Sequence, residues 1–271
     1  MSPRRFKRKT SVPRIDVKKF MAKLEIEKVR DELVLLREIH NSFRKTIPIE
    51  NLNIHYGLSL SLDVQELYRK MVVGNRGGLP LEVNALLYAL LFHLGYDCIL
   101  TSAQLRLNDS YDDEFSHMVV LVKLDDLLVC DVGYIDGCIE PKKIVVDSLQ
   151  VDYARYFKLE KDPDDFFLLR KSSDAVQFET LYRFEVQEKQ LIQFLPRLNY
   201  SRESIKSVFK QQKLVSKFFA EGYLRLTDNR FQSLLEGQTQ DKVLMNEDEF
   251  ISVLEQHFNI TRRDLLQQDS E

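Results

Sequence analysis

Two side chains that could share a proton lie in neighbouring apolar runs of this 271-residue chain. His117 lies in the run 116–124 and Asp131 in the run 127–132, with Asp125 and Asp126 forming a tight turn between the runs. If the runs pair as a hairpin, the carboxylate can meet the imidazole, fix its tautomer and stabilise its protonated form. The pair would then be half of a nucleophilic triad. A packed core histidine and a turn aspartate would also explain each residue separately.

The second chemical feature is a glycine pair that leads into an apolar helix. Gly77 and Gly78 permit either a positive φ or close backbone approach. Pro80 suits the first position of a helix that lasts to Leu94, and Glu82 is favoured by the positive end of its dipole. Such a helix start would stabilise a thiolate or a bound anion. A glycine turn before a core helix can also be purely structural.

An extended segment before the glycine pair carries a carboxylate among apolar neighbours. Pro48 disfavours helix for the residue before it, so that 47–52 is expected to be extended. Glu50 lies within this segment and requires a cationic partner if it is buried. Arg76, next to the glycine pair, is the candidate partner.

The elements that would position these groups fall into three successive regions. Helical periodicity runs through 16–44 in two pieces and returns at 64–71. From Asp97 onward, period-two and β-branched runs predict an antiparallel sheet or small barrel with strands at 99–107, 115–124, 127–132, 143–146, 166–170 and 177–185. The last region is expected to contain helices at 187–194 and 201–208, strands at 214–220 and 223–226, and a final amphipathic helix capped by Asn246.

Composition and cysteine count favour a cytoplasmic protein. Cys98, Cys130 and Cys138 form an odd set without metal-ligand spacing, so we expect neither a disulfide scaffold nor a structural metal site. The apolar runs are much shorter than the roughly 20 residues that cross a membrane, and the N-terminus lacks the apolar core of a signal peptide. We therefore expect no membrane span and no secretion.

The net charge of −3 hides a basic N-terminus. Eight basic residues and one acidic residue occupy positions 1–20, whereas the remainder of the chain carries 31 basic and 41 acidic residues. We predict that residues 1–14 form a disordered basic tail, and that 1–13 are dispensable for folding. Nucleic acid is expected as a partner at most through this tail.

Taken in order, the motifs of this chain resemble those of the arylamine N-acetyltransferase family. They are 15–16 (ID), 47–52 (IPIENL), 76–84 (RGGLPLEVN), 94–96 (LGY), His117 and 131–134 (DVGY), within a resemblance that covers about 15–260. The resemblance implies an α+β fold with a cysteine-protease-like core. Its parts would be an N-terminal helical bundle at 15–96, a central antiparallel β-barrel at 97–186 and a C-terminal α/β lid at 187–271.

Members of this family move acetyl groups from acetyl-CoA to arylamine or hydrazine nitrogens through a Cys-His-Asp triad. The resemblance implies that His117 and Asp131 hold the base and orienter positions. The implied supporting residues are Glu50, Arg76, Gly77 and Gly78. The chain departs from the pattern at the nucleophile, because Pro80 stands where the family has cysteine. Proline offers neither a thiol nor a backbone N–H to a developing oxyanion.

Two smaller departures would change the shape of the pocket. Ile49 replaces the phenylalanine of the family motif. Ile135 replaces the glycine that usually follows the aromatic residue after Asp-Val-Gly, which is Tyr134 in this chain. Both isoleucines are therefore expected to reshape the site around His117.

The native cysteines are poor substitutes for the missing thiol. Cys130 precedes Asp131 on a strand, so the two side chains should point to opposite faces, and we expect Cys130 to pack in the barrel. Cys98 is expected to begin a buried strand. Cys138, in a loop that could approach the site, remains the candidate, although free cysteines usually pack as small apolar residues.

Two functions from different classes remain open. In the first, the chain is a pseudoenzyme that binds a CoA-like or small aromatic ligand in a cleft without acyl transfer. In the second, His117 acts directly as a general base on an amine or water, in an acetyl-CoA-dependent N-acyltransferase or hydrolase. A nucleic-acid or chromatin adaptor is supported by tail composition alone. The expected ligands are acetyl-CoA or CoA, with no metal, and the sequence predicts no oligomeric state.

Overall fold

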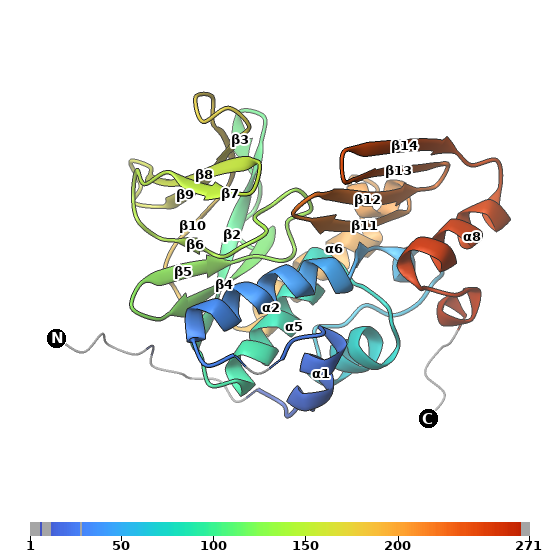
Figure 1. The fold of residues 1–271 in the computed structure, drawn as a ribbon, viewed down its shortest axis with the longest axis horizontal. Coiled ribbons are helices and arrows are strands. Elements are labelled where there is room, and N and C mark those ends of the chain that lie inside the picture. The colour runs from blue at the N-terminus through green and yellow to red at the C-terminus, as the bar shows by residue number, and fades with distance from the viewer. Residues whose placement is uncertain (1–5, 7–11, 28, 267–271) are drawn as a thin grey trace.

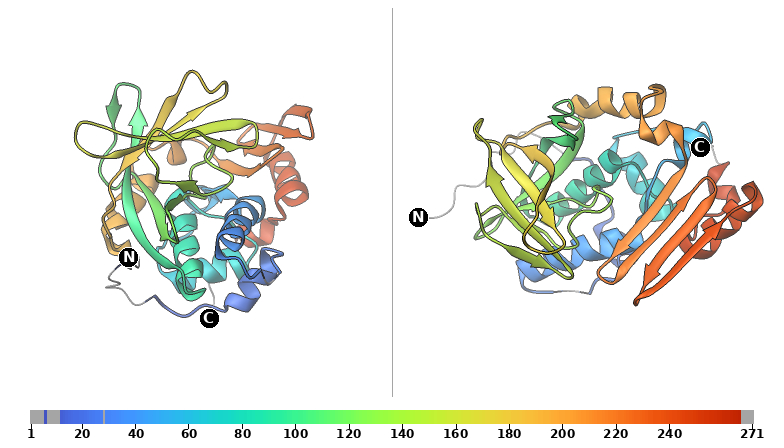
Figure 2. Two further views of the ribbon diagram at one scale, coloured as in Figure 1. Left: turned by 60° about the vertical axis from the view of Figure 1, so that its left-hand side comes forward. Right: turned by 90° about the horizontal axis from the view of Figure 1, so that it is seen from above.

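The computed structural model describes residues 6, 12–27 and 29–266 of the chain. Three parts follow one another: a helical part, a large antiparallel sheet curved into a nearly closed barrel, and a smaller sheet backed by a helix. In Figure 1 the barrel strands and the smaller sheet stand beside each other above the helices, and Figure 2 shows the same arrangement from two further directions. The fold is therefore the mixed α and β architecture that the sequence predicts.

The helical part occupies the region up to residue 93. Its elements are α1 (Val17–Lys23), α2 (Glu32–Thr46), α3 (Leu52–His55), α4 (Val64–Tyr68), a π-helical turn (Arg69–Val73) and α5 (Pro80–His93). Aspartate side chains accept backbone N–H groups at the starts of three helices, at Asp16 for α1, Asp31 for α2 and Asp63 for α4. These caps satisfy donors that helix geometry leaves free, which is why the helices begin there.

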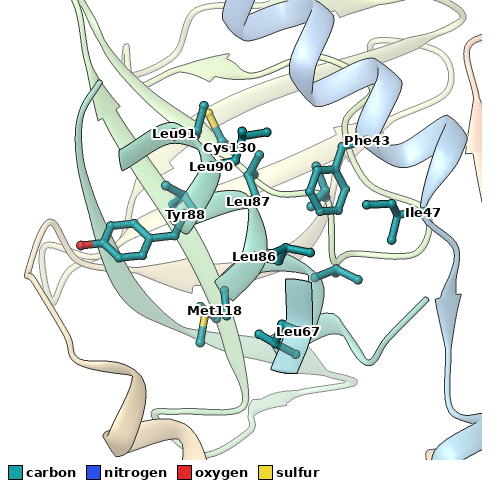
Figure 3. Close-up of a cluster of buried hydrophobic side chains, with 14 of the residues drawn as sticks. Phe43, Ile47, Leu67, Leu86, Leu87, Tyr88, Leu90, Leu91, Met118 and Cys130 are labelled. Atoms are coloured by element: carbon teal, nitrogen blue, oxygen red, sulfur yellow. The ribbon is translucent and has the colours of Figure 1, made fainter. Parts of the chain in front are cut away.

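Helix α5 is the centre of this part. It is apolar all round and buried along most of its length, as expected of a core helix. Figure 3 shows its leucines meeting Phe43 of α2, Leu67 of α4, Met118 and Cys130. The helix ends before Gly95, whose φ of 94° suits glycine. Neither α5 nor any other helix in the described part of the chain is long and apolar enough to cross a membrane.

The barrel sheet contains most of the predicted strands. Its order is β6 (Lys142–Lys143), β5 (Leu127–Cys130), β4 (His117–Lys123), β2 (Asp97–Leu107), β10 (Glu179–Phe184), β9 (Phe167–Ser172), β8 (Arg155–Lys161) and β7 (Gln150–Asp152), with β3 (Ser110–Tyr111) beside β2. The edges β6 and β7 meet through side chains: Gln150 accepts from Lys143 N and donates to Lys143 O, both at 2.8 Å, and Lys142 pairs with Asp152 at 2.9 Å. Strands β7 and β8 were missed, although the alternation of apolar and charged residues at 157–161 is the pattern of a half-buried strand.

The position of Cys130 requires a correction. Val129 faces the barrel interior, with Val119 and Phe157, whereas Cys130 packs on the other face of the sheet against α5 (Figure 3). The expectation that Cys130 packs in the barrel is therefore wrong, because alternation along β5 points it toward the helical core. By the same alternation in β4, His117 shares the face of Val119.

The C-terminal part is a smaller sheet in the order β1–β11–β12–β13–β14, with α8 on one face. Its elements are β1 (Ile49–Glu50), a 3-10 turn (Leu191–Phe194), α6 (Leu195–Glu203), α7 (Val208–Gln211), β11 (Leu214–Phe219), β12 (Gly222–Thr227), β13 (Arg230–Leu235), β14 (Gln238–Val243), α8 (Glu247–Phe258) and a 3-10 turn (Arg262–Leu265). The helices predicted at 187–194 and 201–208 are shifted to these positions. As predicted, the side chain of Asn246 caps α8, accepting from Glu249 N at 3.0 Å.

Part of the predicted N-terminal tail has defined contacts. Phe6 N donates to Asp97 Oδ2 at 3.0 Å, and Val12 packs against the helical core. The Pro13 carbonyl lies 2.8 Å from His93 Nε2, and the Arg14 carbonyl accepts from Gln65. Residues 1–5 and 7–11 of the predicted tail lie outside the described residues. The prediction that 1–13 can be deleted therefore applies to a segment that touches the folded body.

Candidate active site

The structure brings His117 and Asp131 together at the end of the β4–β5 hairpin. His117 Nε2 lies 2.8 Å from Asp131 Oδ2, and the two residues are only 2% and 3% exposed. The imidazole ring also contacts the rings of Tyr134 and Tyr182, at centroid distances of 5.9 and 5.4 Å. Because water is largely excluded, the carboxylate can orient the imidazole and stabilise its protonated form.

The other oxygen of Asp131 is held by amide groups. Oδ1 accepts from Asn84 Nδ2 at 2.8 Å, from Gly133 N at 2.9 Å and from Tyr134 N at 3.1 Å. Asn84 also donates to Met118 O and accepts from Val132 N, so that α5 fixes both strands of the hairpin. Burial opposes ionisation of Asp131, but the neighbouring His117 and these hydrogen bonds hold its pKa well below the usual range. The site therefore contains a fixed carboxylate anion.

A second histidine, His40 of α2, forms a hydrogen bond with the backbone of Asp131. Asp131 N donates to His40 Nε2 at 3.0 Å, and the opposite ring nitrogen, Nδ1, lies 2.8 Å from Ile139 O. These partners assign the proton to Nδ1. Burial, with a smaller effect of the Arg44 charge, lowers the pKa of His40 to about 4. His40 is therefore neutral, and no motif in the sequence singles it out.

Arg44, one turn further along α2, holds the loop that follows Asp131. Its Nη1 donates to Tyr134 O at 2.8 Å and its Nη2 to Ile135 O at 2.9 Å. The guanidinium also lies 5.7 Å from the ring centroid of Phe218 in β11. Tyr134 and Ile135, two of the residues expected to shape the pocket, are therefore fixed through their carbonyls by a buried cation that the sequence motifs do not reveal.

The start of α5 lies against the same loop. A Cβ on Gly133 would come within 2.6 Å of Pro80 O and 3.1 Å of Pro80 Cα, so only glycine permits this approach. Pro80 is thus beside the loop that carries Asp131. Glu82 Oε2 accepts from Leu79 N at 2.8 Å and pairs with Lys70 at 2.9 Å, which anchors the first turn.

The glycine pair serves close backbone approach rather than a positive φ. A Cβ on Gly77 would lie 2.0 Å from Pro48 O. Gly78 N donates to Pro48 O at 3.2 Å, and Gly78 O accepts from Glu50 N at 2.9 Å. Neither glycine belongs to the residues with positive φ. The turn therefore docks the start of α5 onto β1.

The predicted partnership of Glu50 and Arg76 is present. Arg76 Nη2 lies 2.9 Å from Glu50 Oε1, and the side chains are 6% and 0% exposed. Although burial opposes ionisation, the Arg76 charge and a hydrogen bond from Leu52 N keep the pKa of Glu50 below its ordinary value. Arg76 also donates to Asn53 Oδ1 and Asp264 O, which ties the helix start to the C-terminal part.

The native cysteines lie in the interior of the protein. Cys98, Cys130 and Cys138 are all buried. Burial raises the pKa of Cys138 to about 12 and that of Cys130 well above its ordinary value. Buried apolar cysteines of this kind are inert as nucleophiles. Within residues 6, 12–27 and 29–266, no three His, Cys, Asp or Glu side chains are grouped to hold a metal ion.

Comparison with known proteins gives a consistent result. A family model described as N-acetyltransferase matches residues 32–265. Arylamine N-acetyltransferase 1 of Bos taurus is 25% identical over alignments covering 91% of this chain and 94% of the relative, and that of Homo sapiens has the same values. The arylamine N-acetyltransferase structure from M. tuberculosis has a TM-score of 0.83 at 21% identity, covering 94% of this chain and 96% of its own.

A second solved structure, the Mycobacterium marinum arylamine N-acetyltransferase in complex with CoA, also has a TM-score of 0.83, at 18% identity. It covers 93% of this chain and 95% of its own. At these identities the structural matches establish the shared fold, including the helical part, the barrel and the C-terminal sheet. Together with the family model over most of its length, they show that this chain belongs to the arylamine N-acetyltransferase family.

Proposed function

We propose that this chain is a pseudoenzyme that binds a CoA-like or small aromatic ligand in a cleft beside His117 and Asp131, without carrying the acetyl group itself. The observation that carries the proposal is Pro80 at the first position of α5, against Gly133, where the resemblance places the family's cysteine. A covalent acetyl carrier needs a thiolate or another nucleophile at this point. Proline supplies none, and the buried cysteines are inert.

The face of the C-terminal sheet that contacts Arg44 supports a CoA-like ligand. Phe218 stacks on Tyr223 at a centroid distance of 5.7 Å, and Arg225 lies 5.9 Å from the ring centroid of Phe218 and 5.6 Å from that of Tyr223. The register pairs Arg225 with Ser216 and Tyr223 with Phe218, so the four side chains share one face of the sheet. Aromatic rings and a guanidinium suit a ligand that joins a heteroaromatic ring to phosphates.

Titration with CoA and acetyl-CoA tests the proposal by thermal shift of the full chain. A ligand that binds the folded state should raise stability by about 2.7 kcal/mol at a hundred times its Kd. Arg225→Gln should weaken the response, whereas Arg263→Gln, on an exposed 3-10 turn, should leave it unchanged. If CoA, acetyl-CoA and simple arylamines all leave the melting temperature unchanged, the proposed ligand-binding function is wrong.

Incubation with acetyl-CoA should leave the mass of the native protein unchanged. The reason is that neither Pro80 nor the high-pKa cysteines can attack the thioester at neutral pH. Intact mass spectrometry, followed by peptide mapping over Cys98, Cys130 and Cys138, measures this directly. Rapid stoichiometric acetylation of Cys138 would move the nucleophile to the loop and refute the assignment of a pseudoenzyme.

The intact His117–Asp131 pair favours a second function, direct transfer. In this reaction an amine or water attacks the acetyl carbonyl, His117 takes the proton from the attacking atom, and CoA leaves as the thiolate. Arylamine-dependent release of CoA thiol should then be measurable and should vanish in His117→Gln. If thiol release is at background in the native protein, the direct reaction is absent and ligand binding alone remains.

A further inference from the structure

A cavity of about 790 Å³ lies on the barrel sheet. Strands β2, β9 and β10 and the loop that follows Asp131 form its walls. The side chains that matter are Arg106, Asn108, Tyr134, Asp136, Arg170 and Thr180. Its volume is within the usual range for small-molecule sites, which is about 300–1,000 Å³. Its walls are polar and charged rather than apolar, so they suit a hydrophilic ligand.

Two guanidiniums in these walls have unused donors. Arg106 lies 4.9 Å from the ring centroid of Tyr111, and among the described residues no carboxylate lies within ion-pair distance of it. Arg170 Nη1 donates to Glu160 at 2.8 Å and Nη2 to Phe178 O at 2.5 Å, while its buried Nε has no partner. Each guanidinium has five N–H donors, so those of Arg106 and the second N–H of each Arg170 Nη are free for a ligand, whereas the buried Arg170 Nε is not accessible to one.

Arg170 is paired with Glu160 at 2.8 Å, whereas the two carboxylates that line the cavity, Asp136 and Glu179, are paired with other cations. Asp136 is bound by Arg155 and by Lys171, each at 2.6 Å. Glu179 lies 3.2 Å from the same lysine. Because these acids have their own cations, Arg106 keeps an uncompensated charge. Oxygen and nitrogen atoms of Asp136, Asn108 and Thr180 remain available as hydrogen-bond partners for hydroxyl groups.

We propose that this cavity binds a phosphorylated sugar or polyol, with the phosphate on Arg106 and Arg170 and the hydroxyls on Asn108, Asp136 and Thr180. Arginine suits this role because its planar fork matches phosphate oxygens in pairs. This cavity is a different site from the ligand site that we propose beside His117 and Asp131. The two sites share one wall residue, Tyr134, whose ring contacts that imidazole.

Isothermal titration of the full chain with ribose 5-phosphate tests the proposal. Saturable binding is expected, and Arg106→Gln should weaken it about tenfold or more, since a charge-assisted hydrogen bond contributes about 1.5–3 kcal/mol. Arg170→Lys retains the charge opposite Glu160 but removes the fork, so it should weaken binding as well. Arg263→Gln is the matched control and should bind as the native protein does.

Three further ligands test whether the cavity recognises the phosphate group. Ribose should bind far more weakly than ribose 5-phosphate because it has no charged group. Gluconate replaces phosphate by carboxylate, and tighter binding of gluconate would overturn the assignment to phosphate. Inorganic phosphate should compete with ribose 5-phosphate. Absence of binding by ribose 5-phosphate, or equal binding by the native protein, Arg106→Gln and Arg170→Lys, would overturn the site itself.

Discussion

Replacing Pro80 by cysteine should create a thiol that acetyl-CoA acetylates, with transfer to a simple arylamine if the ligand site is competent. The new side chain would lie at the positive end of α5, beside the loop that carries Asp131. Its pKa should be depressed by the helix start and by the imidazolium of His117. Removing a nucleophile from a working triad costs about a factor of a million in rate, so even partial restoration is measurable.

Alkylation by iodoacetamide below neutral pH measures the new thiol directly. It should react well before Cys130 and Cys138, whose pKa values are raised by burial. Pro80→Ser is the matched control, since it restores the backbone N–H without a thiol. The substitution Pro80→Cys should lower the free energy of unfolding by no more than about 1 kcal/mol, because proline at the first helical position stabilises the protein mainly by restricting the unfolded chain.

A double variant tests whether Asp131 contributes to the reactivity of the new thiol. Adding Asp131→Asn to Pro80→Cys should remove most of the low-pH reactivity, because the imidazolium loses the anion that stabilises it. A variant that folds and binds acetyl-CoA but has an ordinary thiol would show that His117 and Asp131 serve packing alone. Ile49, which is 5% exposed, and Ile135 would then be the first residues to test as the cause of a closed site.

Replacing Arg76 by methionine should cost about 3–5 kcal/mol of unfolding free energy at pH 7, because it leaves Glu50 buried without its cation. The pH dependence follows from the lowered pKa of Glu50. In the native protein this carboxylate stabilises the fold above its unfolded pKa, near 4.5, and the contribution is lost as pH falls. The gap in unfolding free energy between native protein and variant should therefore narrow as pH falls below 4.5, as followed by urea unfolding.

An exposed ion pair supplies the control. Arg37 lies 3.5 Å from Glu140, with side chains 46% and 32% exposed, so Arg37→Met should cost less than about 1 kcal/mol. Adding Glu50→Gln to Arg76→Met should recover part of the loss, because the buried charge is removed. Equal costs for Arg76→Met and Arg37→Met would contradict the assignment of Glu50 as a buried anion that depends on Arg76.

The candidate site could be predicted where its parts belong to local patterns. The hairpin containing His117 and Asp131, the turn before Pro80 and the Glu50–Arg76 pair all follow from periodicity, turn residues and charge in apolar surroundings. His40, Arg44 and Asn84 could not be found in this way. Their partners are backbone atoms of distant segments, such as Ile139 O, Tyr134 O and Val132 N, which no spacing in the sequence reveals.

The secondary-structure elements divide in the same way, into those that a local pattern predicts and those that it does not. Strand β11 and helix α8 have an apolar face and were predicted, although the helices before β11 were displaced along the chain. Strands β13 and β14 were missed. Strand β14 is exposed along its whole length and reads QTQDKV, so it has no apolar face to provide a period-two signal. It is held instead by main-chain pairing with β13 and by the ion pair of Arg230 and Asp241.

The pairing of β1 with β11 affects the order in which the chain can fold during translation. Ile49 pairs with Ser216, and Arg76 donates to the carbonyl of Asp264, 188 residues later. At a synthesis rate of about 5–20 residues per second, Arg76 is synthesised roughly 10–40 s before that carbonyl exists. Until β11 has been synthesised, β1 lacks its strand partner, and such an open strand edge is a typical site for chaperone capture. Cellular abundance should therefore depend on C-terminal truncations that remove no residue of the candidate site.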